Sequence, residues 1–273
     1  MHIGTVPLLG VEERAYSAGY ELLLAHTLNV PEREEMVIRR LLSRRVEGLL
    51  IFPVYRLESV APVYDELKRY SVPTVILGPA SAFCSQFIHV QADDTAGCSS
   101  ATRHLLELGH RRIAFFAGPP ASPWAQERFE GYRRALREAG LDVDDKLVFQ
   151  AGSTIEDGTK AALQMLNESC GATAIQTVND LVAIGCADAL FAKGLRIPED
   201  VSLVGFGNIL TAEYFRVPMT TIRQPKYRLG MAAVEAMMNL LKGQRVETKR
   251  LPAELIERKS TAPPKTGANS KPA

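Results

Sequence analysis

The hydrophobic pattern of the chain alternates between short apolar runs and longer segments whose apolar residues recur at helical spacing. Runs typical of buried strands cover 20–26, 47–52, 73–77, 87–90, 112–118, 147–150, 173–178 and 201–206. The segments between them predict helices over 31–45, 59–70, 96–109, 121–140, 157–169 and 180–194. This repeated β-α-β order with apolar strands predicts parallel sheets covered by helices on both faces.

The order of elements changes after residue 219. A strand is expected at 220–224, a helix at 226–242, and two short edge strands within 247–260. The last residues, 261–273, are rich in proline, glycine and serine, and we expect them to be a disordered tail.

Composition narrows the class of protein. The chain of 273 residues is 46% hydrophobic and 23% charged, which is ordinary for a globular protein with ample core. No apolar run is long enough for a transmembrane helix, and the N-terminus lacks the basic region of a signal peptide. We therefore predict a cytoplasmic protein without a membrane partner. A formal net charge of +1 argues against DNA binding by this chain's own surface.

The cysteines and histidines indicate neither a metal nor a disulfide framework. Cys84, Cys98, Cys170 and Cys186 lie far apart with no C-x-x-C pair, so they are expected to serve as isolated small apolar residues. His110 lies in an "LGHRR" turn and is predicted to make a structural polar contact. No catalytic residue, metal ligand or cofactor is assigned.

Five stretches, in order, resemble the effector-binding core of the LacI family of transcriptional regulators. They are "LLSRRVEGLLIFP" (41–53), "VQADDTAGCSSATRHLLELGHRRIAFFAG" (90–118), "RFEGYRRALREAGL" (128–141), "VNDLVAIGCADALFAKGLRIPEDVSLVGF" (178–206) and "MTTIRQPKYRLGMAAVEAM" (219–237). The second resembles the family's hallmark of an Asp-Asn pair, a glycine and a helix that ends in Gly-His. The resemblance covers nearly residues 10–258.

The resemblance implies a periplasmic-binding-protein-like type I fold, with two Rossmann-like parallel-sheet lobes joined by three crossovers. It places the N-terminal lobe at 1–110 plus 222–243 and the C-terminal lobe at 111–221 plus 244–260. It further implies a small-molecule effector in the cleft, a homodimer, and control of operator DNA through a helix-turn-helix headpiece.

The chain departs from the family at its N-terminus. The headpiece is missing, so operator DNA is expected to be reached only through a part absent from this chain. Residues 2–6 either form the family's first strand, as Thr5 and Val6 favour by propensity, or belong to its first helix region. We favour a chain that begins late.

Candidate effector residues follow the predicted strands. Asn179 and Asp180 come after 173–178 and are favoured helix caps, and the resemblance implies that this pair also contacts the effector. Arg128 matches the family's cleft arginine, whose planar donors suit vicinal hydroxyls or a carboxylate. Trp124, the only tryptophan, either packs in the core or covers the apolar face of a sugar.

Two further candidates have weaker support. Phe52 ends the strand over 47–52 and is expected to line the site from the N-terminal lobe. Asp93 starts a predicted helix, where capping is the main alternative to effector contact.

The stretch "VSLVGFGN" (201–208) places Gly207 and Asn208 where most relatives have two acidic residues after Gly-Phe. One interpretation is that Gly207 permits an unusual backbone angle. The other is that a negative charge has been removed, which leaves Arg128 free to pair with an anion. The second interpretation predicts an acidic or larger effector.

We therefore predict the sensing and dimerising part of a LacI-type regulator whose effector is a sugar or sugar acid. One alternative is the sugar-binding protein of a transport system, which shares the lobes but needs an export signal. The other is an enzyme, for which the sequence offers no set of acid, base and nucleophile. We expect no enzymatic activity.

Overall fold

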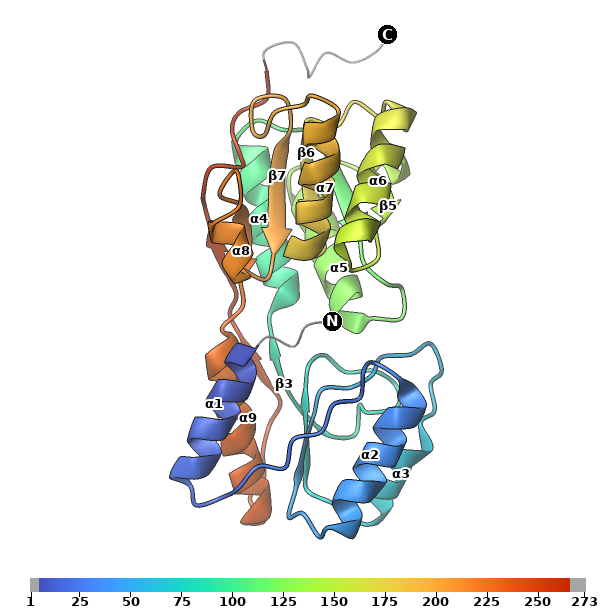
Figure 1. Cartoon of the computed structure of the whole chain (residues 1–273), viewed down its shortest axis with the longest axis vertical. Helices are drawn as coiled ribbons and strands as arrows, with labels where there is room; N and C mark the ends of the chain where they lie inside the picture. The colour runs from blue at the N-terminus through green and yellow to red at the C-terminus, as the bar shows by residue number, and fades with distance from the viewer. Residues whose placement is uncertain (1–4, 266–273) are drawn as a thin grey trace. The chain divides into compact units, whose positions relative to one another are not determined.

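The computed structural model describes residues 5–265 and contains two compact units (Figure 1). Unit 1 comprises the chain up to Ala92 together with Pro225–Leu251, and unit 2 comprises Asp93–Gln224 together with the residues from Pro252 onward. The chain thus passes between the units after Ala92, after Gln224 and after Leu251. Two α/β units with three crossovers confirm the predicted fold class.

Unit 1 has a sheet in the order β1-β2-β3-β9, in which all neighbours are parallel. Its strands are β1 (Leu49–Ile51), β2 (Thr74–Leu77), β3 (Ile88–Ala92) and β9 (Lys249–Leu251). Its helices are α1 (Thr5–Ser17), α2 (Pro31–Ser43), α3 (Pro62–Arg69) and α9 (Lys226–Leu241). Because strand side chains alternate, Ile76 packs toward α2 and α3, whereas Val75 and Leu77 pack toward α9 (Figure 1).

Unit 2 has a sheet in the order β10-β8-β7-β6-β4-β5, in which only β10 is antiparallel to its neighbour. Its strands are β4 (Ile113–Ala117), β5 (Val148–Gln150), β6 (Ala174–Thr177), β7 (Ser202–Phe206), β8 (Thr220–Arg223) and β10 (Glu254–Ile256). Its helices are α4 (Asp94–Glu107), α5 (Pro123–Glu138), the 3-10 turn η1 (Asp145–Leu147), α6 (Ile155–Glu168), α7 (Asp180–Ala192) and α8 (Leu210–Glu213). Two apolar clusters, one with α4 and α5 and one with α6 and α7, bury its two faces.

The prediction of two edge strands within 247–260 is confirmed, and each strand ends a different sheet. β9 pairs with β3 in unit 1 and β10 pairs with β8 in unit 2. The break between them at Pro252 is a crossover. A single short segment therefore closes both sheets.

The predicted strand at 20–26 is wrong. These residues have no regular secondary structure and pair with no described strand, and Leu23 and Leu24 are 52% and 74% exposed. An apolar run forms a strand only where a ladder accepts its backbone groups. Likewise, Thr5 and Val6 lie in α1 and not in a strand, while residues 2–4 fall outside the described part of the chain.

The compact units divide the chain differently from the expected lobes. Helix α4, expected in the N-terminal lobe, belongs to unit 2 because Cys98, Ala101 and Leu105 pack with the apolar residues of β4 and α5. The units therefore divide at Ala92, and not at residue 110.

The expected tail is ordered over its first residues. The Ala262 carbonyl accepts a hydrogen bond from the Ser202 hydroxyl at 3.0 Å, and its amide donates to the same hydroxyl. The Thr261 hydroxyl lies 3.0 Å from His104 Nε2. These partners overcome the low hydrophobicity that predicted disorder at 261–265, and residues 266–273 lie outside the described structure.

Helices α1 and α9 approach each other at two glycines. A Cβ atom on Gly230 would lie 2.2 Å from the carbonyl oxygen of Pro7, and one on Gly10 would lie 2.2 Å from that of Tyr227. A carbonyl of the partner helix cannot move aside as a side chain can. The absence of both Cβ atoms therefore sets how closely α1 packs on unit 1.

We expect Gly230→Ala to destabilise the protein by about 1–3 kcal/mol, because the added methyl group forces the two helices apart. Urea unfolding measures the loss. Leu9→Ala on the exposed side of α1, where Leu9 is 56% exposed, is the control and should change stability by less than about 0.5 kcal/mol. Equal effects of the two variants would contradict this packing.

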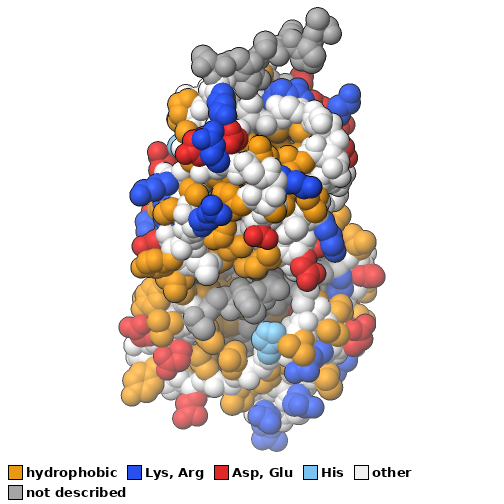
Figure 2. Space-filling view, turned by 45° about the horizontal axis from the view of Figure 1, so that its top comes forward, with side chains coloured by type: hydrophobic (Ala, Val, Ile, Leu, Met, Phe, Trp, Pro, Cys, Tyr) orange, Lys and Arg blue, Asp and Glu red, His pale blue; other side chains and the backbone are white. Residues whose placement is uncertain are grey.

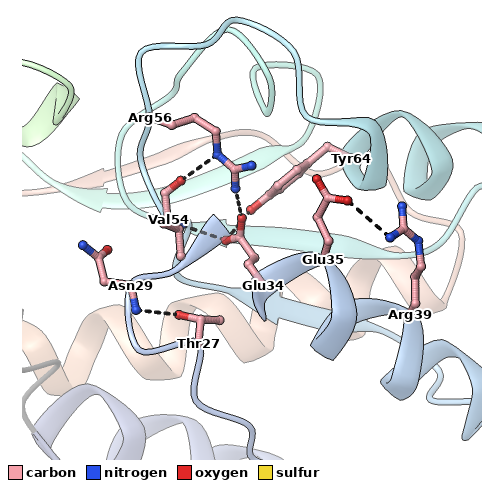
Figure 3. Close-up of polar contacts among 8 residues, drawn as sticks. All are labelled: Thr27, Asn29, Glu34, Glu35, Arg39, Val54, Arg56 and Tyr64. Atoms are coloured by element: carbon pink, nitrogen blue, oxygen red, sulfur yellow. Dashed lines mark hydrogen bonds and ion pairs between the residues drawn. The ribbon is translucent and has the colours of Figure 1, made fainter. Parts of the chain in front are cut away.

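A buried carboxylate holds the loop that follows β1 and carries Phe52. Glu34 of α2 is fully buried and accepts hydrogen bonds from the Val54 amide at 2.7 Å and the Tyr64 hydroxyl at 3.0 Å, and it pairs with Arg56 (Figure 3). Burial raises the pKa of Glu34 more than these donors lower it. The other ionisable groups near it are Glu35, from the next position of α2, and Cys84.

The raised pKa of Glu34 predicts that its contribution to the free energy of unfolding falls as pH rises. The folded state binds the proton more tightly than the unfolded chain, so the stabilisation is present at low pH and is lost as pH rises through the folded pKa. Glu34→Gln mimics the protonated form. The unfolding free energy of the wild type minus that of Glu34→Gln should fall between acidic and neutral pH, and a difference that rises with pH would refute the assignment.

Candidate functional site

The carboxyl ends of three neighbouring strands in unit 2 bring together most of the predicted site residues. Because β7, β6 and β4 are adjacent and parallel, the segments that follow them leave the sheet at one edge. The predicted residues at this edge are Trp124 and Arg128 in α5, Asn179 and Asp180 at the start of α7, and Gly207 and Asn208 after β7. Ligands of open α/β sheets bind at such an edge.

Arg128 is the most highly connected of these side chains. Its side chain is only 9% exposed, and the guanidinium donates from Nε to Asp94 Oδ2 at 2.8 Å and places Nη2 at 2.7 Å from the same oxygen. Nη1 donates to the carbonyl of Val178, at the end of β6, at 2.7 Å. The guanidinium carbon lies 3.8 Å from the ring centre of Phe206 and 4.7 Å from that of Trp124.

These contacts correct one prediction. We expected that the missing carboxylate at position 207 leaves Arg128 free to pair with an anion. Instead, Asp94 already supplies the counter-charge, because a buried guanidinium without one is strongly destabilised. Arg128 is therefore not the unpaired cation that predicted an acidic effector.

Asn179 and Asp180 are both engaged by the protein at the start of α7. Asn179 is the N-cap: its Oδ1 accepts from the Val182 amide at 2.8 Å and its Nδ2 donates to the Ser153 carbonyl at 3.0 Å. Asp180 is buried, and its carboxylate accepts from the Thr221 hydroxyl at 2.6 Å and the Ile209 amide at 2.8 Å. Capping by Asn179 is confirmed, and Asp180 fixes the loop after β7.

The loop after β7 depends on glycine. Gly207 has φ +127°, which only glycine adopts without strain, and its amide donates to the Ile222 carbonyl at 2.8 Å. A Cβ atom there would lie 3.5 Å from Asp180 Oδ2. Asn208 has φ +47°, and its Oδ1 accepts from Arg258 at 2.8 Å. The interpretation of Gly207 as a residue required by an unusual backbone angle is confirmed.

Trp124 lies in the first turn of α5 and is half-buried. One part of its ring packs on the core of unit 2 and the ring faces the Arg128 guanidinium. Packing in the core accounts for part of the Trp124 side chain, and contact with a sugar stays a prediction.

The last two predicted residues come from other elements, namely the start of α4 and the loop after β1 of unit 1. Asp93 caps α4 by accepting a hydrogen bond from the Ala96 amide at 3.0 Å. Phe52 belongs to unit 1, where it is half-buried against the cluster that includes Val75 and Met237. Its loop is the one that Glu34 holds.

The sequence reasoning missed two residues that contact one another beside Arg128. Asp94 and Gln224, the partners of the Arg128 network, are joined by a 2.7 Å hydrogen bond from Nε2 to Oδ1. The only sequence signal was that the family's Asp-Asn pair has Asp94 as its second member. Asp94 and Arg128 are 34 positions apart in the chain, so no local sequence pattern indicates that they form an ion pair.

The structure gives no support to a hydrolytic or metal-dependent site. His110 is buried and contacts Thr173 Oγ1 at 2.8 Å and Ser202 Oγ at 3.1 Å, and burial lowers its pKa. Its predicted structural role is confirmed. Within residues 5–265 no group of three His, Cys, Asp or Glu side chains is placed to hold a metal ion, and no helix is long and apolar enough to span a bilayer.

Comparison with known proteins identifies the family. The family model of the periplasmic binding protein-like domain matches residues 102–261. The HTH-type transcriptional repressor PurR of Vibrio atlanticus is 34% identical over 253 residues, which span 91% of this chain and 74% of that protein.

Solved structures agree with the sequence relatives. The transcriptional regulator CelR in complex with cellobiose is 30% identical, with a TM-score of 0.84 over 94% of this chain and 78% of that one. A LacI family regulator from Enterococcus faecium with bound ribose is 26% identical, with a TM-score of 0.82 over 96% and 94% of the two chains. These likenesses favour a regulator over a transport protein, and the chain belongs to the LacI family of transcriptional regulators, of which it contains the effector-binding core.

Proposed function

We propose that this chain senses a small sugar-like effector at the strand-end site of unit 2, and that binding modulates operator DNA binding by a helix-turn-helix headpiece. The observation that carries the proposal is the group formed by Trp124, Arg128 and Asn179 at the carboxyl ends of β4 and β6. Aromatic faces and fixed polar donors are the groups that bind sugars. Two solved relatives hold cellobiose and ribose.

Of a neutral sugar and a sugar acid, the geometry supports the neutral one. Asp94 already compensates the charge of Arg128, and Asp180 adds a second buried carboxylate at the same edge. A ligand carboxylate bound there meets these negative charges without a matching excess of positive charge.

We also propose a homodimer, and an apolar surface of unit 2 supports it. Leu210 and Tyr214, at the two ends of α8, are each 77% exposed. Next to them in the chain, Phe215 and Arg216 line a hollow of about 450 Å³ with Asp188, Phe191 and Ala192 of α7. Large exposed apolar side chains mark interfaces, and a second copy of the chain supplies the same surface in return.

The charges of the chain fit a sensor that leaves DNA contact to the headpiece. Figure 2 shows basic and acidic side chains across the same face rather than one broad basic region. The formal net charge of +1 is also low for a protein that binds phosphates through its own surface. A regulator of this kind acts in the cytoplasm and without catalysis.

We expect at least one neutral sugar in a panel of sugars, sugar acids and nucleobases to stabilise the protein. A ligand at a hundred times its dissociation constant adds about 2.7 kcal/mol. Thermal unfolding measures this effect, and the emission of Trp124, the only tryptophan, reports on the site itself. Trp124→Phe keeps a ring over Arg128 and should retain the thermal shift without the emission change. Stabilisation by sugar acids alone would contradict a neutral effector, and stabilisation by no class would contradict the sensor.

We expect the double variant Leu210→Glu, Tyr214→Glu to be monomeric at micromolar concentrations at which the wild type is a dimer, because charges replace the proposed apolar contact. Sedimentation velocity measures the state. Tyr70→Glu, at a tyrosine of unit 1 that is 64% exposed, is the control and should remain dimeric. A double variant that sediments like the wild type would place the interface elsewhere.

A further inference from the structure

Asp94 divides its carboxylate between two partners. Oδ2 receives the Arg128 guanidinium at 2.7 and 2.8 Å, and Oδ1 receives the Gln224 amide at 2.7 Å. The Asp94 side chain is only 5% exposed, so both contacts are made away from water. A change at one oxygen is therefore felt at the other, because a buried carboxylate has no solvent to replace a lost donor.

The two partners differ in where they lie along the chain. Asp94 is the second residue after the chain enters unit 2, and Gln224 is the last residue before the chain leaves it. The hydrogen bond between them thus ties the first crossover to the second, inside unit 2. Neither residue belongs to a strand, so no sheet ladder makes this link.

The third crossover reaches the same turn of α4. A Cβ atom on Gly97 would lie 3.1 Å from the Cβ of Ala253, the second residue after the chain re-enters unit 2, and 3.0 Å from Ile222 of β8. Glycine at 97 therefore lets the segment after Leu251 pack against the first turn of α4. All three crossovers meet at this turn.

Arg128 extends the network from Asp94 to the ends of β6 and β7. It donates to the carbonyl of Val178, the residue before the Asn179 cap, and its guanidinium lies on the ring of Phe206, the residue before Gly207. The network Gln224–Asp94–Arg128 therefore joins the crossovers to the two segments that border the proposed site.

We infer that Asp94 and Gln224 are positioning residues that couple the effector site to the crossovers. Asp94 fixes Arg128 in the site, and Gln224 passes any displacement of Asp94 to the second crossover. The coupling to ligand rests on the proposed function, whereas the tie between the crossovers is independent of it.

Hydrogen exchange of the unliganded protein tests the tie. In Gln224→Met, which keeps the length of the side chain and removes its donor, amides at the first turn of α4 and the start of α9 should exchange about tenfold faster than in the wild type. Gly97 and Leu229 are suitable amides, because each donates to a carbonyl beside a crossover, that of Asp93 and that of Pro225. Ile175 in the centre of unit 2 serves as the internal reference for global stability.

Arg223→Met is the matched control, since Arg223 precedes Gln224 and pairs only with exposed Glu254 among the described residues. It should leave exchange at Gly97 and Leu229 unchanged. Equal exchange at these amides in Gln224→Met and the wild type, or acceleration that Ile175 shares in full, would overturn the tie.

Cellobiose and D-ribose are the probes for the coupling. Whichever sugar binds the wild type should slow exchange at both crossovers. At a sugar concentration that saturates the variant, Gln224→Met should lose the slowing at Leu229, because the hydrogen bond from Gln224 to Asp94 is gone. Retained slowing there refutes the coupling while the sensor stands. Binding of neither sugar contradicts the coupling to a sugar effector, whereas exchange of the unliganded protein alone decides the tie between the crossovers.

Discussion

The buried charge of Arg128 is the constraint on which the strand-end region of unit 2 depends. An arginine side chain that is only 9% exposed has to be given a counter-charge and acceptors by the protein itself. Asp94 and the Val178 carbonyl meet that need, and the ring of Phe206 covers one face of the cation. These contacts fix α4, α5 and the ends of β6 and β7 relative to one another. The region is therefore arranged before any ligand arrives, which lowers the entropic cost of binding.

Unit 1 also buries a charged side chain, of the opposite sign. Glu34 is the buried ion there, and its donors come from Val54, Arg56 and Tyr64, two of them in the loop after β1. Each unit thus fixes a segment beyond a strand end by burying one charged side chain and satisfying it locally. Side-chain contacts of this kind act where the sheet ladder has ended, because beyond the last ladder bond the backbone has no other partner.

The fold was largely predictable from sequence, whereas the partners within the site were not. Strands such as 173–178 and 201–206 were predicted because apolar periodicity is local and strong. The strand at 20–26 failed because pairing depends on a neighbour that no local pattern specifies, and its leucines lie exposed instead. Arg128 and Asn179 were recognised by resemblance, but the ion pair with Asp94 joins segments that only the packing of α4 on α5 brings together.

The glycines of "VSLVGFGN" leave space for the carboxylate of Asp180. A Cβ atom on Gly205 would lie 2.2 Å from Asp180 Oδ1, so this strand position has to be glycine for the Asp180 carboxylate to lie against it. The same carboxylate holds the Ile209 amide and lies 3.5 Å from where a side chain at Gly207 would begin. A second carboxylate at 207 begins beside the negative charge of Asp180 in a half-buried loop, which is unfavourable. Gly207 is therefore better understood as a consequence of where Asp180 lies than as the removal of a charge in favour of an anionic effector.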